Sequence, residues 1–527
     1  MIDFSKMRFL VVDDFSEFRS SIRGILGLLA VQHIDTAANG EDVMELCRRN
    51  RYDVILHDYN LGDGVNGQQV LERLHAEKLL APHCIFIMVT AENTQAMVLA
   101  AIECEPDDYL SKPFSKVVLQ TRLERMARRK RVLAPVLDAQ ARGDWAGVLQ
   151  ACAGIEADEP RHAALCQRHK AAALRNLGRF LELERELERQ ARSRPASWNL
   201  QMLARLWLQQ GRDDKLTALL NAATRQFPLL PELHDIHAEL AARGGDLSAS
   251  VRHLQHAVSL SPNTIRRQVA LARMAWLDDQ PEVMAAAVRH CWEAGRHSVV
   301  FDPELLWQLA VVLAQGSGRN QEELQYWLRI LQQRDMQTAA LQPALTLLRL
   351  EQARLQGRKP PADETETAAR AVTAQLQNLD VVTLLQLGDL LTGLEQPAAA
   401  AACWQACGMR HAGLAGVAEQ LARRLPELDL RSALEAVGVG REAAARQALE
   451  QPGPAAELFA QALQHSAEQI EINMAAARLF AAGMTAGNGA AQDQLQQCLQ
   501  RIGNLSVLAA EHPGFMELKN RLELRVW

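Results

Sequence analysis

The sequence predicts two folds in one chain: an α/β doubly wound domain on a parallel five-stranded sheet, then an all-α superhelix of repeated helix pairs. Two observations lead to this prediction. Short apolar runs alternate with amphipathic stretches in the first part, as in a parallel sheet covered by helices. Farther on, glycine and proline recur about every 34 residues, a period typical of helix-turn-helix repeats. The predicted parts are a domain at 1–120, a basic connector at 121–134, regular repeats at 135–296 and degenerate repeats or a helical subdomain at 297–527.

The strands of the first domain are predicted from short, continuously apolar runs. The runs are residues 9–12, 54–56 and 84–89, with a weaker one at 31–36. The stretches between them have apolar residues at helical spacing. Helices are therefore expected at 16–29, 41–49, 68–77 and 94–102.

Five polar residues lie where predicted strands end. They are Asp13, Asp14, Asp58, Thr90 and Lys112. The carboxyl ends of strands form the ligand crevice of an open parallel sheet, so we expect these side chains to converge. Carboxylates favour a hard divalent cation, and Mg²⁺ is the default where phosphate also binds. The cation and the Lys112 ammonium would offset the charge of a phosphoryl group on Asp58, to which Thr90 could donate a hydrogen bond.

The same residues belong to four motifs. In order along the chain these are Val-Val-Asp13-Asp14, Leu-His-Asp58, Val-Thr90-Ala91 and Tyr109-Leu-Ser-Lys112-Pro113. Together they resemble the response-regulator receiver domain of two-component signalling, a CheY/flavodoxin-like fold. The resemblance implies that Asp58 accepts a phosphoryl group from a phosphohistidine of a sensor histidine kinase. It also implies that Mg²⁺ is held by Asp13, Asp14, Asp58 and the main-chain carbonyl of Asn60.

Further roles follow from the resemblance alone. It implies that Thr90 and Tyr109 form a switch that moves when phosphate binds. Asn60 and Glu92 match positions that border the attacking water and tune the lifetime of the acyl phosphate, and this pair is typical of fast self-dephosphorylation. Receivers of this type often dimerise through the face that holds Tyr109, so a homodimer is an open alternative.

The segment Gly62-Asp63-Gly64-Val65-Asn66-Gly67 has the spacing of a dinucleotide-binding loop. It follows the third predicted strand rather than the first, and Asp58 already occupies the crevice beside it. We interpret it as a turn after the acceptor aspartate and expect no nicotinamide cofactor.

The connector at 121–134 carries a net charge of +5, next to a first domain with −7. A basic helix of this kind is usually solvated or neutralises an acidic neighbour. Few turn residues separate it from the next helix, so we expect a stiff connection that could transmit a change mechanically. Nucleic-acid or membrane binding is the minority interpretation, and the chain's total charge of −6 argues against a large nucleic-acid surface.

The period of the second part is set by two residue types. Glycines stand at 143, 178, 211 and 245, and prolines at 160, 195, 228 and 262. We expect glycine to supply a left-handed residue between paired helices and proline to close the second helix. About four units from 135 to 262 thereby resemble tetratricopeptide repeats (TPR).

Repeat arrays of this kind present long concave surfaces with few catalytic groups, so we expect a protein or peptide partner in the groove and no enzyme activity beyond self-dephosphorylation. Two histidine pairs, His234 with His237 and His253 with His256, could each bind metal. Neither pair has a third ligand nearby in sequence, which favours surface or core histidines.

Composition suggests the compartment. Nine cysteines at irregular spacings suit a reducing environment, and no run is long enough for a signal peptide or a membrane span. We therefore expect a cytoplasmic protein without membrane insertion.

The leading hypothesis is a response regulator without DNA-binding output, in which phosphorylation of Asp58 controls protein binding by the helical array. One alternative is a phosphate sink, or an inhibitor that grips a kinase or sister regulator. A weaker alternative is nucleic-acid binding through the basic connector.

Overall fold

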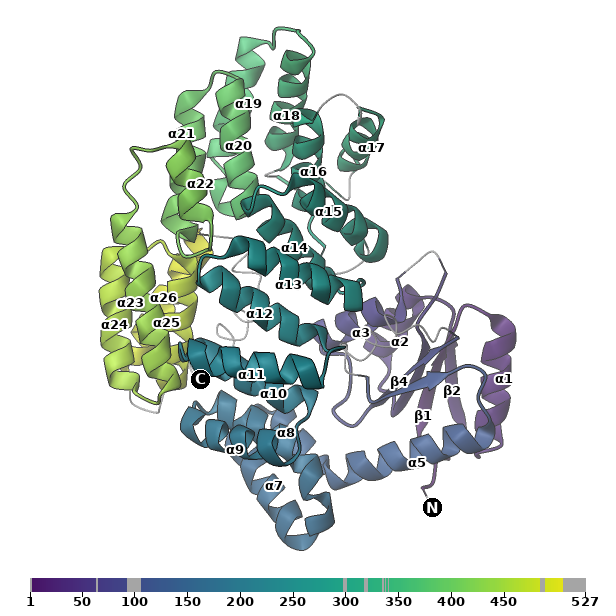
Figure 1. The fold of residues 1–527 in the computed structure, drawn as a ribbon. Coiled ribbons are helices and arrows are strands. Elements are labelled where there is room, and N and C mark those ends of the chain that lie inside the picture. The colour runs from purple at the N-terminus through teal and green to yellow at the C-terminus, as the bar shows by residue number, and fades with distance from the viewer. Residues whose placement is uncertain are drawn as a thin grey trace.

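The computed structural model describes residues 2–62, 65–91, 106–296, 301–316, 321–333, 336, 338–339, 341–483 and 489–505. An α/β domain lies beside a large curved array of helices (Figure 1). The helix expected at 94–102 lies outside the described residues.

The first domain has a five-stranded parallel sheet, as predicted. Its strands are β1 (Arg8–Val12), β2 (His33–Ala37), β3 (Val54–Asp58), β4 (Ile85–Thr90) and β5 (Asp108–Ser111), in the order β2-β1-β3-β4-β5. The described helices that cover it are α1 (Ser16–Gly27), α2 (Gly40–Arg49), α3 (Gly67–Ala76) and α5 (Lys116–Val132). The three central strands are almost wholly buried, and each face of the sheet has its own apolar core. This explains their uninterrupted apolar sequence.

Helix α5 joins the two parts and runs across the boundary expected at residue 120. Only Leu133 separates it from α6 (Ala134–Ala141). This residue is both the C-cap of α5 and the N-cap of α6. Three basic residues of α5 pair with carboxylates of the first domain. Arg122 and Arg125 form ion pairs with Asp108, and Lys130 pairs with Asp107. The connector thus neutralises its acidic neighbour, one of the two roles expected for it.

The second part is built mostly from antiparallel pairs of helices. Its first members are α6, α7 (Trp145–Asp158), α8 (Ala163–Asn176), α9 (Phe180–Ser193), α10 (Ser197–Gln209), α11 (Asp213–Gln226), α12 (Pro231–Arg243), α13 (Leu247–Leu260), α14 (Ile265–Leu277) and α15 (Pro281–Gly295). Those that follow are α16 (Glu304–Gln315), α17 (Gln321–Leu331), α18 (Leu341–Leu355), α19 (Ala362–Thr373), α20 (Val381–Gly393), α21 (Pro397–His411), α22 (Val417–Arg424), α23 (Arg431–Ala448), α24 (Pro452–His465), α25 (Ile470–Gly483) and α26 (Gly489–Leu505).

The glycines of the 34-residue period lie where the sequence predicts. Each sits between the helices of a pair with a positive φ, from +68° to +84°. The 34-residue glycine period stops after Gly245, but other residues adopt the same conformation in later, irregularly spaced turns. Asp279, Glu395 and Glu450 have φ of 55°, 59° and 58° in the turns before α15, α21 and α24. A search for glycine therefore misses these later pairs.

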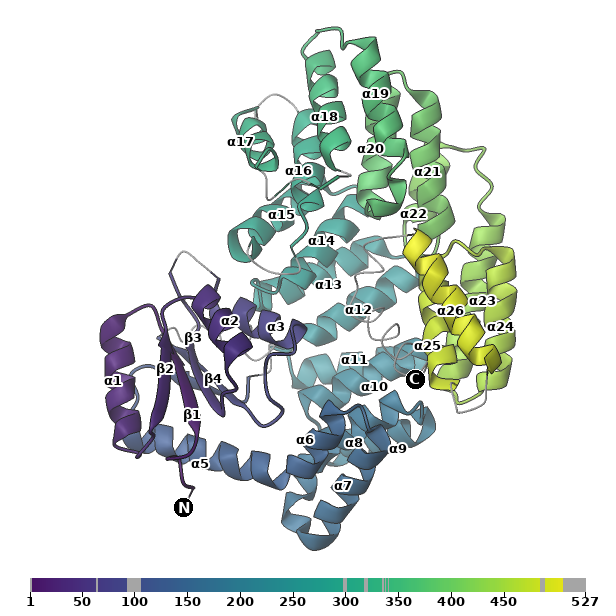
Figure 2. The ribbon, with the colours of Figure 1, turned by 180° about the vertical axis from the view of Figure 1, so that it is seen from behind.

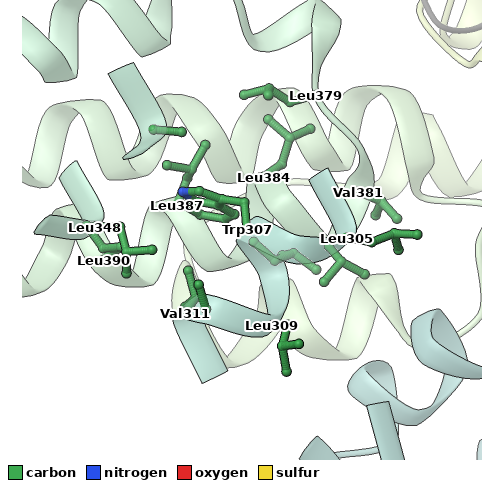
Figure 3. Close-up of a cluster of buried hydrophobic side chains, with 14 of the residues drawn as sticks. Leu305, Trp307, Leu309, Val311, Leu348, Leu379, Val381, Leu384, Leu387 and Leu390 are labelled. Carbon is green, nitrogen blue, oxygen red and sulfur yellow. The ribbon is translucent and has the colours of Figure 1, made fainter. Parts of the chain in front are cut away.

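The array curls back on itself, so that α23–α26 lie beside α10 and α11 (Figures 1 and 2). The Gln210 side chain donates to the carbonyl of Ala448 at 3.2 Å, and the Leu181 amide donates to Glu450 at 2.8 Å. One large apolar core extends from Ala238 to Leu425, with fully buried Trp307 within it (Figure 3). A separate core joins α23 to α26.

Within the described residues, every helix falls short of the length and apolarity that crossing a bilayer requires.

Candidate functional site

The parallel register brings the ends of four strands to one edge of the sheet. Val12 is level with His57, Asp58 with Val89, and Thr90 with Ser111. The next residue after β1 is Asp13 and the next after β5 is Lys112, so their side chains leave the sheet beside Asp58. The structure thus brings together the polar residues that the sequence places at strand ends.

Three carboxylates form the centre of the site. Asp13, Asp14 and Asp58 each have a carboxylate oxygen within 4.8 Å of the others. Asp13 is 1% exposed and Asp58 6%, whereas Asp14 is open to solvent. One oxygen of Asp13 accepts from the Phe15 amide at 2.9 Å, which fixes the carboxylate. Oxygen ligands this close, with one on the solvent side, suit a hard divalent cation that keeps part of its water.

The Lys112 ammonium lies between two of these carboxylates. Its Nζ is 2.5 Å from Asp13 Oδ2 and 2.8 Å from Asp58 Oδ2. It also lies 4.1 Å from the centre of the Phe18 ring, whose face attracts a cation. Sequence reasoning missed Phe18, which lies on the amphipathic helix α1 and resembles an ordinary core residue there.

Burial and charge act in opposite directions on Asp58. Burial raises the pKa of this carboxyl to about 6, and the nearby Asp13 charge adds to the rise, while the Lys112 ammonium lowers it. A carboxylate must be ionised to attack phosphorus. With a pKa of about 6, most Asp58 side chains carry the required charge at neutral pH.

A cavity of about 360 Å³ opens over the carboxylates. Its lining consists of Asp13, Asp14, Phe15, Phe18, Asp58, Asn60, Thr90, Ala91 and Lys112. Thr90 is buried at the end of β4, and small Ala91 after it leaves the rim open. Asn60 is exposed and lines the mouth of the cavity, and its role as a main-chain ligand stays a prediction.

The remaining predicted residues are placed less directly. Tyr109 is half-buried on β5 and packs against the apolar core beneath α2 and α3. Its role as a switch stays a prediction. Glu92, expected to tune dephosphorylation, lies outside the described residues.

The glycine-rich segment after β3 serves backbone packing. Gly67 begins α3, and a Cβ atom there would lie 2.5 Å from the Asp58 carbonyl oxygen and 2.9 Å from His57 Nδ1. Gly62 has a φ of +72°, which favours glycine. These two needs account for glycines at the ends of the motif and agree with its interpretation as a turn.

Comparison with known proteins covers the first domain. Residues 9–124 match the family described as response regulator receiver domain. Chemotaxis protein CheY-3 of Vibrio cholerae serotype O1 is 27% identical over 123 residues, covering 23% of this chain and 93% of that protein. Chemotaxis protein CheY of Pseudomonas aeruginosa is 29% identical over 123 residues, covering 23% of this chain and 98% of that protein. A solved BeF₃-activated DrrB receiver domain has 24% identity and a TM-score of 0.21, covering 23% of this chain and 97% of that structure.

Proposed function

Because residues 9–124 form the receiver domain of a two-component response regulator, with an aspartate phosphoacceptor site, we propose that phosphorylation of Asp58 controls protein binding by the helical array. A sensor histidine kinase supplies the phosphoryl group. The observation that carries the proposal is direct contact between the receiver and the array. The chain acts as a phosphoacceptor that loses its phosphate by hydrolysis, not as an enzyme for another substrate.

The transfer step follows from the site. The phosphorus–nitrogen bond of a kinase phosphohistidine breaks as a bond forms between phosphorus and an Asp58 oxygen. Asp13, Asp14, Asp58 and the Asn60 carbonyl would hold Mg²⁺, which would supply positive charge to the phosphoryl oxygens. Lys112 is placed to leave its ion pair with Asp58 and contact the transferred group, because its Nζ already lies within 2.8 Å of the acceptor.

Two contacts dock the receiver on the array. The Gln69 side chain on α3 donates from Nε2 to the Ala294 carbonyl on α15 at 2.9 Å. His83 Nε2 lies 2.7 Å from Asp138 Oδ1 on α6. Both views place α3 at the side of the receiver that faces the array (Figures 1 and 2).

Helix α3 also touches the acceptor. Gly67 packs closely on the Asp58 carbonyl, and its amide donates to the Tyr59 carbonyl at 2.7 Å. Asn66 and Gln69 cap the helix reciprocally, each accepting from the other's main-chain amide. The Gln69 side chain therefore caps the start of α3 and also hydrogen-bonds to the array. A shift of the acceptor loop on phosphorylation changes the energy of this contact, which is the differential interaction that a switch needs.

The array supplies the output. Its pairs of helices, with a left-handed residue in each of several turns, support a TPR-like superhelix whose partner is a protein or peptide. The ion pairs that α5 makes with the receiver occupy Arg122, Arg125 and Lys130. This weighs against the connector as a nucleic-acid surface.

Hydrogen exchange of the full chain tests the coupling. We expect beryllium fluoride with Mg²⁺, which mimics the acyl phosphate, to speed amide exchange in α3 and α15 as their contact loosens. The Asp58→Asn variant should show no such change. Identical exchange in wild-type α15 with and without the mimic would overturn the proposal.

Affinity capture with and without the beryllium fluoride mimic distinguishes controlled protein binding by the array from the phosphate-sink alternative. A partner other than a kinase, bound in one state and released in the other, supports a controlled adaptor. A histidine kinase as the sole partner in both states supports a phosphate sink or kinase inhibitor instead.

A further inference from the structure

Four histidines from two neighbouring helices gather in the array. His234 and His237 lie on α12, and His253 and His256 lie on α13, each pair three residues apart and so on one helix face. The ring centres of His237 and His253 are 4.6 Å apart, and those of His234 and His256 are 4.3 Å apart. His234 also lies 5.9 Å from His253 and 6.2 Å from His237. Each pair thus supplies the ligands that the other lacks in sequence.

The central imidazole has no hydrogen-bond partner in the described part of the protein. His234 is 7% exposed, and both its Nδ1 and Nε2 are buried and unpaired. A neutral imidazole has one donor and one acceptor nitrogen, and leaving either buried and unpaired costs about 1–3 kcal/mol. Nearby Arg267 offers no relief, because its guanidinium is paired with Asp235 at 2.8 Å.

The ring centres have a spacing compatible with a single ion, although among the described residues no three of the four histidines have nitrogen atoms that all lie within 4.8 Å of one another. Two imidazoles on one tetrahedral ion, with metal–nitrogen bonds of roughly 2.0–2.1 Å, have ring centres roughly 5 Å apart. The measured separations of 4.3–6.2 Å bracket this value. His237 and His253 are stacked face to face, so their rings must turn about χ2 to aim nitrogens at a shared point. That torsion is soft in histidine.

We propose that His234, His237 and His253, with His256 completing the set, bind a divalent transition-metal ion such as Zn²⁺ between α12 and α13. Imidazole nitrogen suits this class of ion, whereas Mg²⁺ prefers the carboxylate oxygens of the receiver. The bound ion cross-links two helices of one repeat and stiffens the middle of the array. The chain then holds two chemically distinct ion sites.

Zinc titration of the full chain, stripped of metal with a chelator, tests this site. An excess of Mg²⁺ keeps the receiver carboxylates occupied, and a chromophoric chelator reports free Zn²⁺. We expect one tight equivalent. Both His237→Asn and His253→Asn should weaken Zn²⁺ binding by more than about tenfold. Loss of a residue that only hydrogen-bonds to a metal ligand already weakens binding by about that factor. His465→Asn, on α24 away from the cluster, should leave the affinity unchanged.

The visible absorption of bound Co²⁺ tests metal binding directly, because histidines that only stabilise the fold would not affect it. Co²⁺ bound by several imidazoles in a tetrahedral site shows intense visible absorption, which His253→Asn should abolish while circular dichroism confirms the fold. The inference is overturned if no tight equivalent binds. It is also overturned if the His237 and His253 variants bind Zn²⁺ as tightly as the His465 control.

Discussion

The reactivity proposed for Asp58 depends on surroundings that its neighbours in sequence do not supply. Asp13 comes from β1 and Lys112 from the end of β5, while the backbone around Asp58 is shaped by Gly67. Asp13 and Lys112 are predictable from sequence because each follows a recognisable strand. Phe18, which lies over the Lys112 ammonium, is not, because an aromatic residue on an amphipathic helix is usually core.

Replacing Gly67 tests the close approach at the acceptor. Gly67→Ala puts a methyl group 2.5 Å from the Asp58 carbonyl and 2.8 Å from Met88 Sδ. We expect a loss of about 1–3 kcal/mol in the free energy of unfolding, together with slower phosphorylation, measured by calorimetry and intact mass. Gly24→Ala is the matched control, because nothing lies within 4 Å of that Cβ. A helix interior should gain roughly 0.5–1 kcal/mol from it. Equal effects of the two changes would contradict the packing argument.

At the scale of elements, the glycine period ends in the sequence although pairs of helices continue in the structure. Glycine is the residue best suited to a left-handed turn, but Asp and Glu occupy that conformation at Asp279, Glu395 and Glu450. Helix pairs persist because their apolar faces pack, whatever residue makes the turn. The regular period could thus be predicted up to residue 262, whereas the left-handed conformation of Asp279, Glu395 and Glu450 could not.

Two turn substitutions should have opposite signs. Glu395→Gly should raise stability by up to about 1 kcal/mol, because relief of roughly 1–2 kcal/mol of left-handed strain exceeds the entropy cost of glycine. Gly211→Ala, at a φ of +68°, should lower it by about 1 kcal/mol or more. Urea unfolding followed by tryptophan fluorescence measures both, since all nine tryptophans follow residue 144 in the sequence and none lies in the receiver. A loss of stability in Glu395→Gly would contradict the account of the later turns.

The α3 contact can be broken without removing its helix cap. Gln69→Glu keeps an acceptor for the Asn66 amide but replaces the donor to Ala294 with a carboxylate, so it repels the carbonyl. We expect faster hydrogen exchange in α15 with α3 still protected. Asn66→Ala is the complementary variant, because it removes the other half of the cap and keeps the Gln69 donor. Unchanged α15 exchange in Gln69→Glu would mean that this bond does not hold the receiver to the array.

At the scale of the whole molecule, the closed curve of the array places charged residues far apart in sequence around one cavity of about 630 Å³. Glu304 on α16 is 5% exposed and accepts from the Asp380 amide at 2.9 Å and from Thr383 Oγ1 at 2.8 Å. Burial, with the charges of Asp302 and Asp380, raises the pKa of Glu304 from 4.5 to about 8.

This raised pKa predicts how stability depends on pH. Between its ordinary pKa of 4.5 and about 8, Glu304 holds its proton in the folded chain and loses it in the unfolded chain. Its contribution to stability therefore falls as pH rises through that window, by at most about 1.4 kcal/mol per pH unit. Glu304→Gln keeps an acceptor oxygen and cannot ionise. The free energy of unfolding of this variant, relative to that of wild type, should therefore rise as pH increases. Parallel pH profiles of the two proteins, measured by urea unfolding, would contradict the assignment.

Long-range geometry is also where prediction from sequence stops. The receiver's site follows from local signals at strand ends, which a parallel sheet must bring together. The docking of Gln69 on Ala294 and the return of α23 to α10 depend on how helices accumulate twist. No single segment carries that information.

The central claim is that Asp58, held among acidic neighbours with Lys112, accepts phosphate when Mg²⁺ is present. Incubation of the full chain with acetyl phosphate and Mg²⁺, followed by intact-mass and peptide mass spectrometry, tests it most directly. We predict the addition of one phosphoryl group, located at Asp58 and lost in Asp58→Asn or without Mg²⁺. An unchanged mass, or a phosphoryl group mapped to another residue, would contradict the account.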